Sequence, residues 1–200
     1  GDASLLPRLL HGVIMHGEQH LHPDHRGRVT SYYQHSSGIG AALLARRDRP
    51  GAMRVGVIGL GTGTLAAYGR KGDTYRFYDI NLRVMEIAAR EFTYLSDSEA
   101  TIELELGDAR LSLEHEPPQH FDVLAIDAFS SDAIPVHLIT REALALYLRH
   151  VKPDGIVAFH VSNRFLDLVP VAARLARENG VHAVAVFEGS DEEESRTQSD

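Results

Sequence analysis

Short segments rich in β-branched residues alternate with segments of helical periodicity from residue 51 to residue 187. The segments with strand character are Met53–Ile58, Thr74–Asp79, Thr101–Leu106, Phe121–Ile126, Gly155–Val161 and Val181–Phe187. The segments with helical spacing are Leu82–Thr93, Thr140–His150 and Phe165–Asn179. Consecutive parallel strands need a crossover, usually a helix, whereas antiparallel strands need only a tight turn. The alternation therefore predicts an α/β fold with a parallel sheet that is covered on both faces.

The first fifty residues follow a different pattern. Leu9–Met15 and Val29–Tyr33 have the character of short strands, and Ile39–Arg47 has that of a helix. We therefore divide the chain into an N-terminal β-rich appendage (1–50), an α/β core (51–187) and an acidic tail (188–200). In the tail, carboxylates far outnumber the single arginine, so we expect it to be solvated and mobile.

The composition excludes several classes of protein. A domain with a net charge of −8 is a poor partner for the phosphates of nucleic acids, so no nucleic-acid partner is expected. Without cysteine the chain has no disulfide and no thiolate ligand or nucleophile. No apolar run reaches the roughly 18 residues of a membrane span. The 12 histidines are not accompanied by a carboxylate–histidine motif at metal-ligand spacing, so we predict no metal site.

A glycine-rich turn, Gly59-Leu60-Gly61-Thr62-Gly63, directly follows the first core strand. Glycines at such a turn let the backbone approach a ligand closely, with amide N–H groups pointing at it. The second strand ends at Asp79, about twenty residues further on, where an acid commonly binds the two hydroxyls of a ribose. Strand, glycines and acid together favour a nucleoside ligand over a turn that serves packing alone, and we expect the α/β core to bind it.

Two further aspartates follow the third and fourth strands. Asp108 lies in Gly107-Asp108-Ala109, and Asp127 opens a loop that also contains Asp132. Ligands of parallel α/β sheets bind outside the carboxyl ends of the strands, so these acids and the glycine turn would line one edge. Each aspartate taken alone could instead be the N-cap of a helix. Two carboxylates five positions apart could hold a cationic amine or remove its proton.

These residues resemble the spermidine synthase family, the polyamine aminopropyltransferases and their relatives. The resemblance begins with His16-Gly17-Glu18-Gln19 and Thr30-Ser31-Tyr32-Tyr33, which look like the family's N-terminal strand segment. The glycine turn and the aspartates then match its nucleoside-binding and catalytic positions in order. The segments HGVIMHGEQ and DAFSSDAIPVHLIT are closest to bacterial spermidine-synthase-like domains that are often fused behind a membrane-spanning region.

The resemblance implies a Rossmann-like fold of the S-adenosylmethionine-methyltransferase type with a small N-terminal β-rich segment. The co-substrate would be decarboxylated S-adenosylmethionine, or S-adenosylmethionine in a divergent member, without a metal. The implied activity is transfer of an aminopropyl group to a small-molecule amine in polyamine biosynthesis. The resemblance further implies a homodimer in the cytoplasm and a longer protein, whose upstream membrane region would hold this domain at the cytoplasmic face.

The family's roles carry over to matching positions of this chain. The positions that match the donor site are Gln19, Gly59, Gly61, Thr62, Gly63, Asp79, Asp108 and Ala109. Among them, Gln19 would contact the nucleoside, Asp79 would hold the ribose hydroxyls, and Asp108 would accept from the adenine amine. In the catalytic half, Asp127 would be the base or the amine anchor, and Tyr33 would orient the acceptor amine. Asp132 would supply a second acid.

Three departures from the family bear on the amine half of the site. Aminopropyltransferases usually carry an acid inside the glycine turn, where this chain has Thr62. The usual Asp-Ser-x-Asp-Pro loop is changed so that the second acid is displaced to Asp132, and the Tyr-His-Glu element reads Tyr33-Gln34-His35. Two alternatives therefore stay open beside aminopropyl transfer. One is an S-adenosylmethionine-dependent methyltransferase, and the other is a non-catalytic domain that binds a nucleoside or a polyamine.

Overall fold

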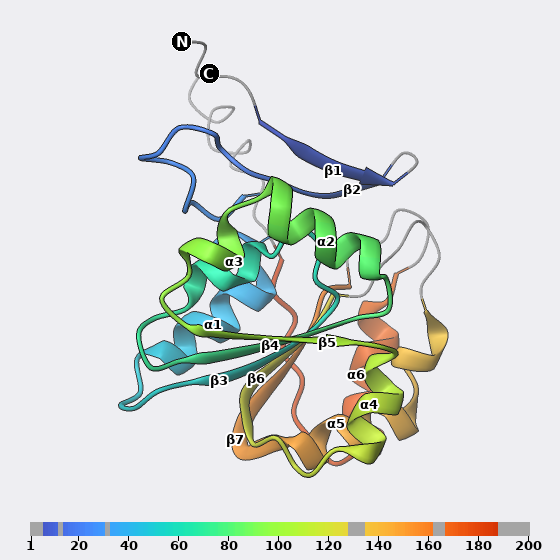
Figure 1. Cartoon of the computed structure of the whole chain (residues 1–200). Coiled ribbons are helices and arrows are strands. Elements are labelled where there is room, and N and C mark those ends of the chain that lie inside the picture. Colours follow the sequence, from blue (N-terminus) through green and yellow to red (C-terminus); the bar gives the residue numbers. More distant parts are fainter. Residues whose placement is uncertain (1–5, 12–13, 31–32, 128–134, 162–166, 188–200) are drawn as a thin grey trace, which may run out of the picture.

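The computed structural model describes residues 6–11, 14–30, 33–127, 135–161 and 167–187. A central sheet lies between two layers of helices, and a separate two-stranded hairpin lies beyond one of these layers (Figure 1). Within these ranges, no helix has the length and apolar character needed to cross a bilayer. The predicted acidic tail and Asp132 fall outside the described residues.

The central sheet has five parallel strands in the order β5-β4-β3-β6-β7. Their bounds are Arg54–Ile58 (β3), Thr74–Asp79 (β4), Thr101–Leu106 (β5), Phe121–Ile126 (β6) and Val151–Phe159 (β7). The chain runs outward from β3 to β5 and then returns to place β6 on the other side of β3. Ligands of parallel sheets bind at such a reversal, outside the carboxyl ends of the strands. The predicted parallel α/β sheet is confirmed, and β4, β5 and β6 have the predicted bounds.

Helices cover both faces of the sheet. They are α1 (Gly38–Arg47), α2 (Leu82–Glu91), α3 (Tyr94–Asp97), α4 (Ala109–His115), α5 (Arg141–His150) and α6 (Val169–Glu178), with 3-10 turns at Thr64–Tyr68 (η2) and Val136–Leu138 (η3). In Figure 1, α1, α2 and α3 lie above the sheet, and α4, α5 and α6 lie below it. Val123 and Ala125 of β6 pack into the core on the α1 side, whereas Leu124 and Ile126 pack into the core on the α5 side. Because successive side chains alternate between the two cores, β6 is apolar from Val123 to Ile126.

The N-terminal segment differs from its predicted form. The predicted strand Leu9–Met15 is a hairpin of two antiparallel strands, β1 (Arg8–His11) and β2 (Ile14–Glu18). His11 pairs with Ile14, so the chain reverses inside the predicted strand. An apolar run does not reveal such a reversal, because the residues on both sides of it have the same strand character.

Two other predicted strands are wrong. At Val29–Tyr33, the Thr30 hydroxyl donates to the Glu18 carbonyl at 2.6 Å, and the Tyr33 amide bonds back to the Thr30 carbonyl at 3.4 Å. Of this stretch the structure describes Val29, Thr30 and Tyr33, and none of these three lies in a strand. The alternating segment Val181–Phe187 forms no strand, and Val184 is 89% exposed. Alternation indicates a strand only where a neighbouring strand supplies hydrogen-bond partners for the backbone.

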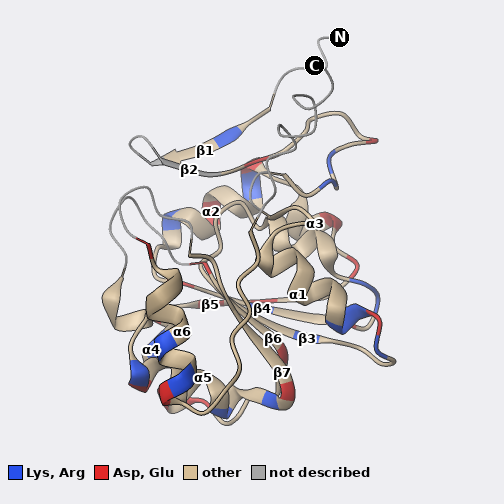
Figure 2. Ribbon diagram, turned by 180° about the vertical axis from the view of Figure 1, so that it is seen from behind, with Lys and Arg blue, Asp and Glu red and all other residues tan. Residues whose placement is uncertain are grey.

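A buried ion-pair network joins α1 to the amino ends of the strands. Asp122 Oδ1 lies 2.8 Å from both Arg46 Nη2 and Lys152 Nζ, and Oδ2 accepts from the Arg54 amide at 2.9 Å. Figure 2 shows acidic and basic residues gathered where α1 ends and β3 begins. Burial raises the pKa of Asp122. The hydrogen bonds from Lys152, the Arg54 amide and Arg46 outweigh burial, so the net pKa lies below its ordinary value.

Replacing Asp122 with Asn is expected to lower the free energy of unfolding by about 2 kcal/mol at neutral pH, because buried Arg46 loses one of its two charged partners and keeps only the more exposed Asp154. A carboxyl whose pKa is lower in the folded state than in the unfolded state stabilises the fold. This contribution is fully present above its unfolded-state pKa, about 4, and is lost as the pH falls through its folded-state pKa. In urea unfolding, the difference between wild type and Asp122→Asn should therefore shrink below about pH 4. A difference that stays constant under acid would contradict this.

Candidate functional site

The glycine turn and the acid of the predicted nucleoside site are in direct contact. Gly59–Gly63 connects the carboxyl end of β3 to η2, and Asp79 is the last residue of β4. Asp79 Oδ2 accepts a hydrogen bond from the Leu60 amide at 3.0 Å, and its Oδ1 accepts a second backbone amide. Gly63 has φ 81°, and a Cβ there would lie 2.8 Å from the Leu95 side chain. The turn therefore needs glycine at this position.

Thr62, which occupies the place of the family's acid, is buried with 1% of its surface exposed. Its Oγ1 lies 2.8 Å from the Thr64 Oγ1, within hydrogen-bond distance. Gly17 of β2 packs directly against it, so that a Cβ on Gly17 would overlap Oγ1 of Thr62. Gly17 also has φ 145°, which favours glycine. The hairpin therefore closes over this side of the glycine turn, and the residue beneath it is uncharged.

Gln19 ties the end of β2 to the turn after α2. Its Nε2 donates to Thr93 Oγ1 and to the Arg26 carbonyl, each at 2.8 Å, and its Oε1 accepts from the Thr93 amide at 2.9 Å. The residue is 3% exposed. These bonds hold the N-terminal segment against the core. The predicted contact between Gln19 and the nucleoside stays a prediction.

Asp127 lies at the centre of a group of three polar side chains. Its Oδ2 accepts a hydrogen bond from the hydroxyl of Tyr33, and its Oδ1 lies 2.7 Å from His160 Nδ1. The side chains of Asp127 and His160 are 6% and 17% exposed, and Tyr33 is buried. The structure thus brings together two residues that the sequence places far apart, Tyr33 and Asp127, and adds His160 to them. Asp132, the predicted second acid, lies outside the described residues.

The strand order explains why His160 reaches Asp127. Asp127 directly follows β6, and His160 directly follows β7, which is the neighbouring parallel strand. The His160 amide donates to the Ile126 carbonyl at 3.0 Å and so extends the ladder between these strands. Sequence analysis misses His160 because this residue falls inside the predicted strand Gly155–Val161, whereas β7 ends at Phe159. The signal was available: polar residues that directly follow adjacent parallel strands share one edge of the sheet.

Asp108 combines a structural role with a position at the same edge. Its Oδ1 accepts from the Leu111 amide at 3.0 Å and caps α4, whose first residue, Ala109, is buried. Its Oδ2 lies 3.0 Å from Nε2 of His137, which belongs to η3. The N-cap interpretation is therefore confirmed, and the proposed adenine contact would use a carboxylate that His137 already touches. Sequence analysis did not single out His137, because no spacing linked it to Asp108.

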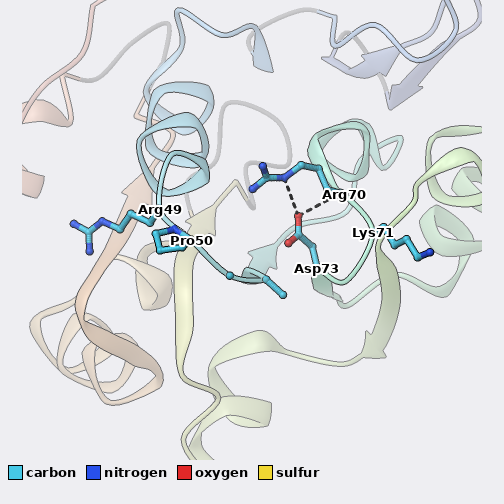
Figure 3. Close-up of a pocket in the computed structure, with 7 residues that line it drawn as sticks. Arg49, Pro50, Arg70, Lys71 and Asp73 are labelled. Atoms are coloured by element: carbon cyan, nitrogen blue, oxygen red, sulfur yellow. Dashed lines mark hydrogen bonds and ion pairs between the residues drawn. The ribbon is translucent and has the colours of Figure 1, made fainter.

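A pocket of about 370 Å³ lies at the opposite edge of the sheet, next to the amino ends of β3 and β4. Its lining residues are Arg49, Pro50, Gly51, Ala52, Arg70, Lys71 and Asp73. In Figure 3, Arg70 reaches toward Asp73, whereas Arg49 and Lys71 extend away from it. The pocket contains none of the predicted site residues, and its cations do not converge on a common point. Within the described ranges, no group of three or more histidine and acidic side chains could hold a metal.

The sequence matches no protein-family profile and no curated protein. Human methyltransferase-like protein 13 in complex with SAH aligns with 68% of this chain and 69% of its own, at 18% identity and a TM-score of 0.57. A spermidine synthase in complex with the transition-state analogue AdoDATO aligns with 74% of this chain and 51% of its own, at 20% identity and a TM-score of 0.57. A probable spermidine synthase from Corynebacterium glutamicum aligns with 66% and 48%, at 18% identity and a TM-score of 0.55.

The fold is that of the S-adenosylmethionine-dependent methyltransferases. Spermidine synthases share this methyltransferase fold, so the predicted fold class is confirmed. At these identities the likeness is one of fold. The chain spans about half the length of the spermidine synthases that it matches.

Proposed function

We propose that this chain transfers an aminopropyl group from decarboxylated S-adenosylmethionine to a small-molecule amine. The observation that carries the proposal is the buried carboxylate of Asp127, which Tyr33 and His160 hold beside the reversal between β3 and β6. In folds of this type, that reversal is where ligands bind. Both partners of the reaction are cationic in water, and a fixed carboxylate is suited to holding an ammonium group there.

The reaction needs positioning and the removal of one proton. The amine nitrogen attacks the carbon next to the sulfonium sulfur, in line with the departing sulfur. The new N–C bond forms as the C–S bond breaks, and the electron pair of the broken bond neutralises the sulfonium. Because only a neutral amine has a lone pair, the acceptor ammonium first gives one proton to the carboxylate of Asp127. The product is a secondary ammonium, so charge and atoms balance.

The residues around the glycine turn support the donor half of the proposal. Asp79 already touches the turn through Leu60, and one of its oxygens could also accept from a ribose hydroxyl, because a carboxylate offers about four acceptor sites. Asp108 would likewise use a remaining acceptor site of its carboxylate for the adenine amine. These two assignments follow the family resemblance and the shared edge of the sheet.

Methyl transfer from S-adenosylmethionine is the second candidate, and Thr62 is the observation that favours it. Aminopropyltransferases usually place an acid at this position to pair with the ammonium of the donor's tail. Here the position holds a neutral, buried side chain. Intact S-adenosylmethionine carries its own carboxylate beside its ammonium, so it needs such an acid less.

Calorimetric titration with decarboxylated S-adenosylmethionine, S-adenosylmethionine and methylthioadenosine separates the alternatives. Preference for the decarboxylated donor, followed by release of methylthioadenosine with a diamine, is the expected result. Preference for the intact donor would move the assignment to methyl transfer. Binding of the nucleosides without turnover by any amine would favour the non-catalytic binding domain, and binding of none would overturn the proposal.

Asp108→Ser tests the nucleoside half on its own. Serine caps helices as well as aspartate does, so the stability of α4 should be retained while the carboxylate is lost. We expect the affinity for methylthioadenosine to fall about tenfold, the loss of one hydrogen bond to a charged group. The matched variant Asp108→Ala should lose this affinity and also about 1 kcal/mol of stability through the lost cap. If Asp108→Ser bound methylthioadenosine as tightly as wild type, the role of Asp108 would be confined to capping α4.

A further inference from the structure

The contact between Asp127 and His160 fixes the state of the imidazole. A carboxylate only accepts hydrogen bonds, so the nitrogen 2.7 Å from Oδ1 must be the donor. Neutral His160 therefore carries its proton on Nδ1. The Tyr33 hydroxyl donates to Oδ2 of the same carboxylate. Each oxygen of Asp127 thus accepts one hydrogen bond from a side chain that is itself largely buried.

Because each oxygen of Asp127 accepts one hydrogen bond, the directions of the carboxylate's remaining lone pairs are fixed. An ionised carboxylate has about four acceptor sites, and here two of them are occupied by Tyr33 and His160. The plane of the carboxylate, and therefore the remaining lone pairs, cannot turn without breaking one of these bonds. A reacting group that approaches Asp127 therefore meets a carboxylate whose orientation is already fixed.

We propose that His160 is a positioning residue of the transfer site, which acts through Asp127 by donating Nδ1–H to Oδ1. The inference rests on the proposed function, because it takes Asp127 as the carboxylate that meets the acceptor amine. His160 holds that carboxylate in its productive orientation from the β7 side, while Tyr33 holds it from the N-terminal segment. The amine-facing group of this site is therefore built from three separate parts of the chain.

The contact is not a by-product of sheet formation. The backbone of His160 already completes the ladder through its amide bond to the Ile126 carbonyl at 3.0 Å. Any residue other than proline at this position would leave that bond intact. The imidazole–carboxylate bond is a separate feature, and it depends on a donor at the position of Nδ1.

Two substitutions at this position separate the donor from the rest of the side chain. His160→Asn places an amide N–H close to where Nδ1 lies and keeps the donor, whereas His160→Leu fills similar space without one. His182→Leu, at an exposed histidine of the C-terminal segment, is the matched control. Release of methylthioadenosine from decarboxylated S-adenosylmethionine is measured with a panel of linear diamines, and binding of methylthioadenosine is measured by calorimetry.

We expect His160→Leu to lower kcat about 100-fold, the effect of a misplaced reacting group, and His160→Asn to stay within about fivefold of wild type. Both variants should bind methylthioadenosine like the control. Wild-type rates in both variants would overturn the inference and leave the proposed function standing. Equal losses in both would also overturn it, because the Nδ1 donor would then not be what matters. A wild type that transfers to no diamine would overturn the proposed function and this inference with it.

Nitrogen NMR of the wild-type histidines tests the geometry without turnover. The neutral imidazole of His160 should be the Nδ1–H tautomer. Asp127→Asn should weaken that preference, because an asparagine whose single oxygen accepts from Tyr33 turns its NH2 donor toward Nδ1. The opposite tautomer in the wild type would overturn the inference whatever the rates of the variants.

Discussion

Asp127→Asn is expected to reduce turnover by a factor of about 10² to 10⁴ while leaving the affinity for methylthioadenosine almost unchanged. Asparagine has the same shape, and its oxygen can still accept from Tyr33. It carries no charge to hold an ammonium and cannot take the proton that the acceptor ammonium must lose before it attacks. Steady-state release of methylthioadenosine measures the first effect, and calorimetry measures the second.

The control for this experiment is Asp24→Asn, which removes a carboxylate from an exposed loop of the N-terminal segment. It changes the net charge by the same amount, so a difference between the two variants reports position and not overall charge. If Asp127→Asn turned over as fast as Asp24→Asn, Asp127 would have no role in the reaction. Loss of nucleoside binding in Asp127→Asn would instead mean that the substitution disturbs the whole edge of the sheet.

The sequence predicts the core strands well because their pattern has one physical cause. A parallel strand covered on both faces must be apolar on successive residues, as Val123–Ile126 is. The strands also end where a polar residue lies at the edge of the sheet, as at Asp79 and Asp127. These features depend on residues close together in the chain, so they can be recognised before the strand order is known.

The sequence-based predictions fail where the structure of a segment depends on residues far away in the chain. Val181–Phe187 alternates like a strand, yet the described structure provides no neighbouring strand for it. His160 and Asp127 are 33 positions apart and meet only because β7 lies beside β6. The contact of Asp108 with His137 spans 29 positions and depends in the same way on where η3 lies. Periodicity contains none of this information, whereas strand order supplies much of it.

Thr62 shows what the structure adds to a departure from a family pattern. The sequence shows only that the acid of the glycine turn is missing. The structure shows that the position is buried beneath Gly17 and that Thr62 bonds to Thr64. A neutral residue therefore suits these surroundings. Replacing it with the family's acid tests whether the ammonium of the donor's tail lies beside this position.

Thr62→Asp is expected to lower the free energy of unfolding of the unliganded protein by about 3 to 5 kcal/mol, because it buries a charge without a partner. For a chain of this size, such a loss lowers Tm by about 10 °C. The control is Thr62→Val, which has nearly the same shape and loses only the hydrogen bond to Thr64, about 1 kcal/mol. Thermal unfolding of the two variants measures the difference, and equal Tm values would mean that water reaches this position.

The same variant also distinguishes the two donors. If the ammonium of the aminopropyl tail lies beside position 62, decarboxylated S-adenosylmethionine supplies the missing partner for the new carboxylate. It should then raise the Tm of Thr62→Asp more than that of wild type, because a ligand stabilises in proportion to its affinity for the folded state. Methylthioadenosine has no ammonium and should raise both equally. Equal shifts with every ligand would place the tail elsewhere, and the case for methyl transfer would then strengthen, because that reaction needs no acid at this turn.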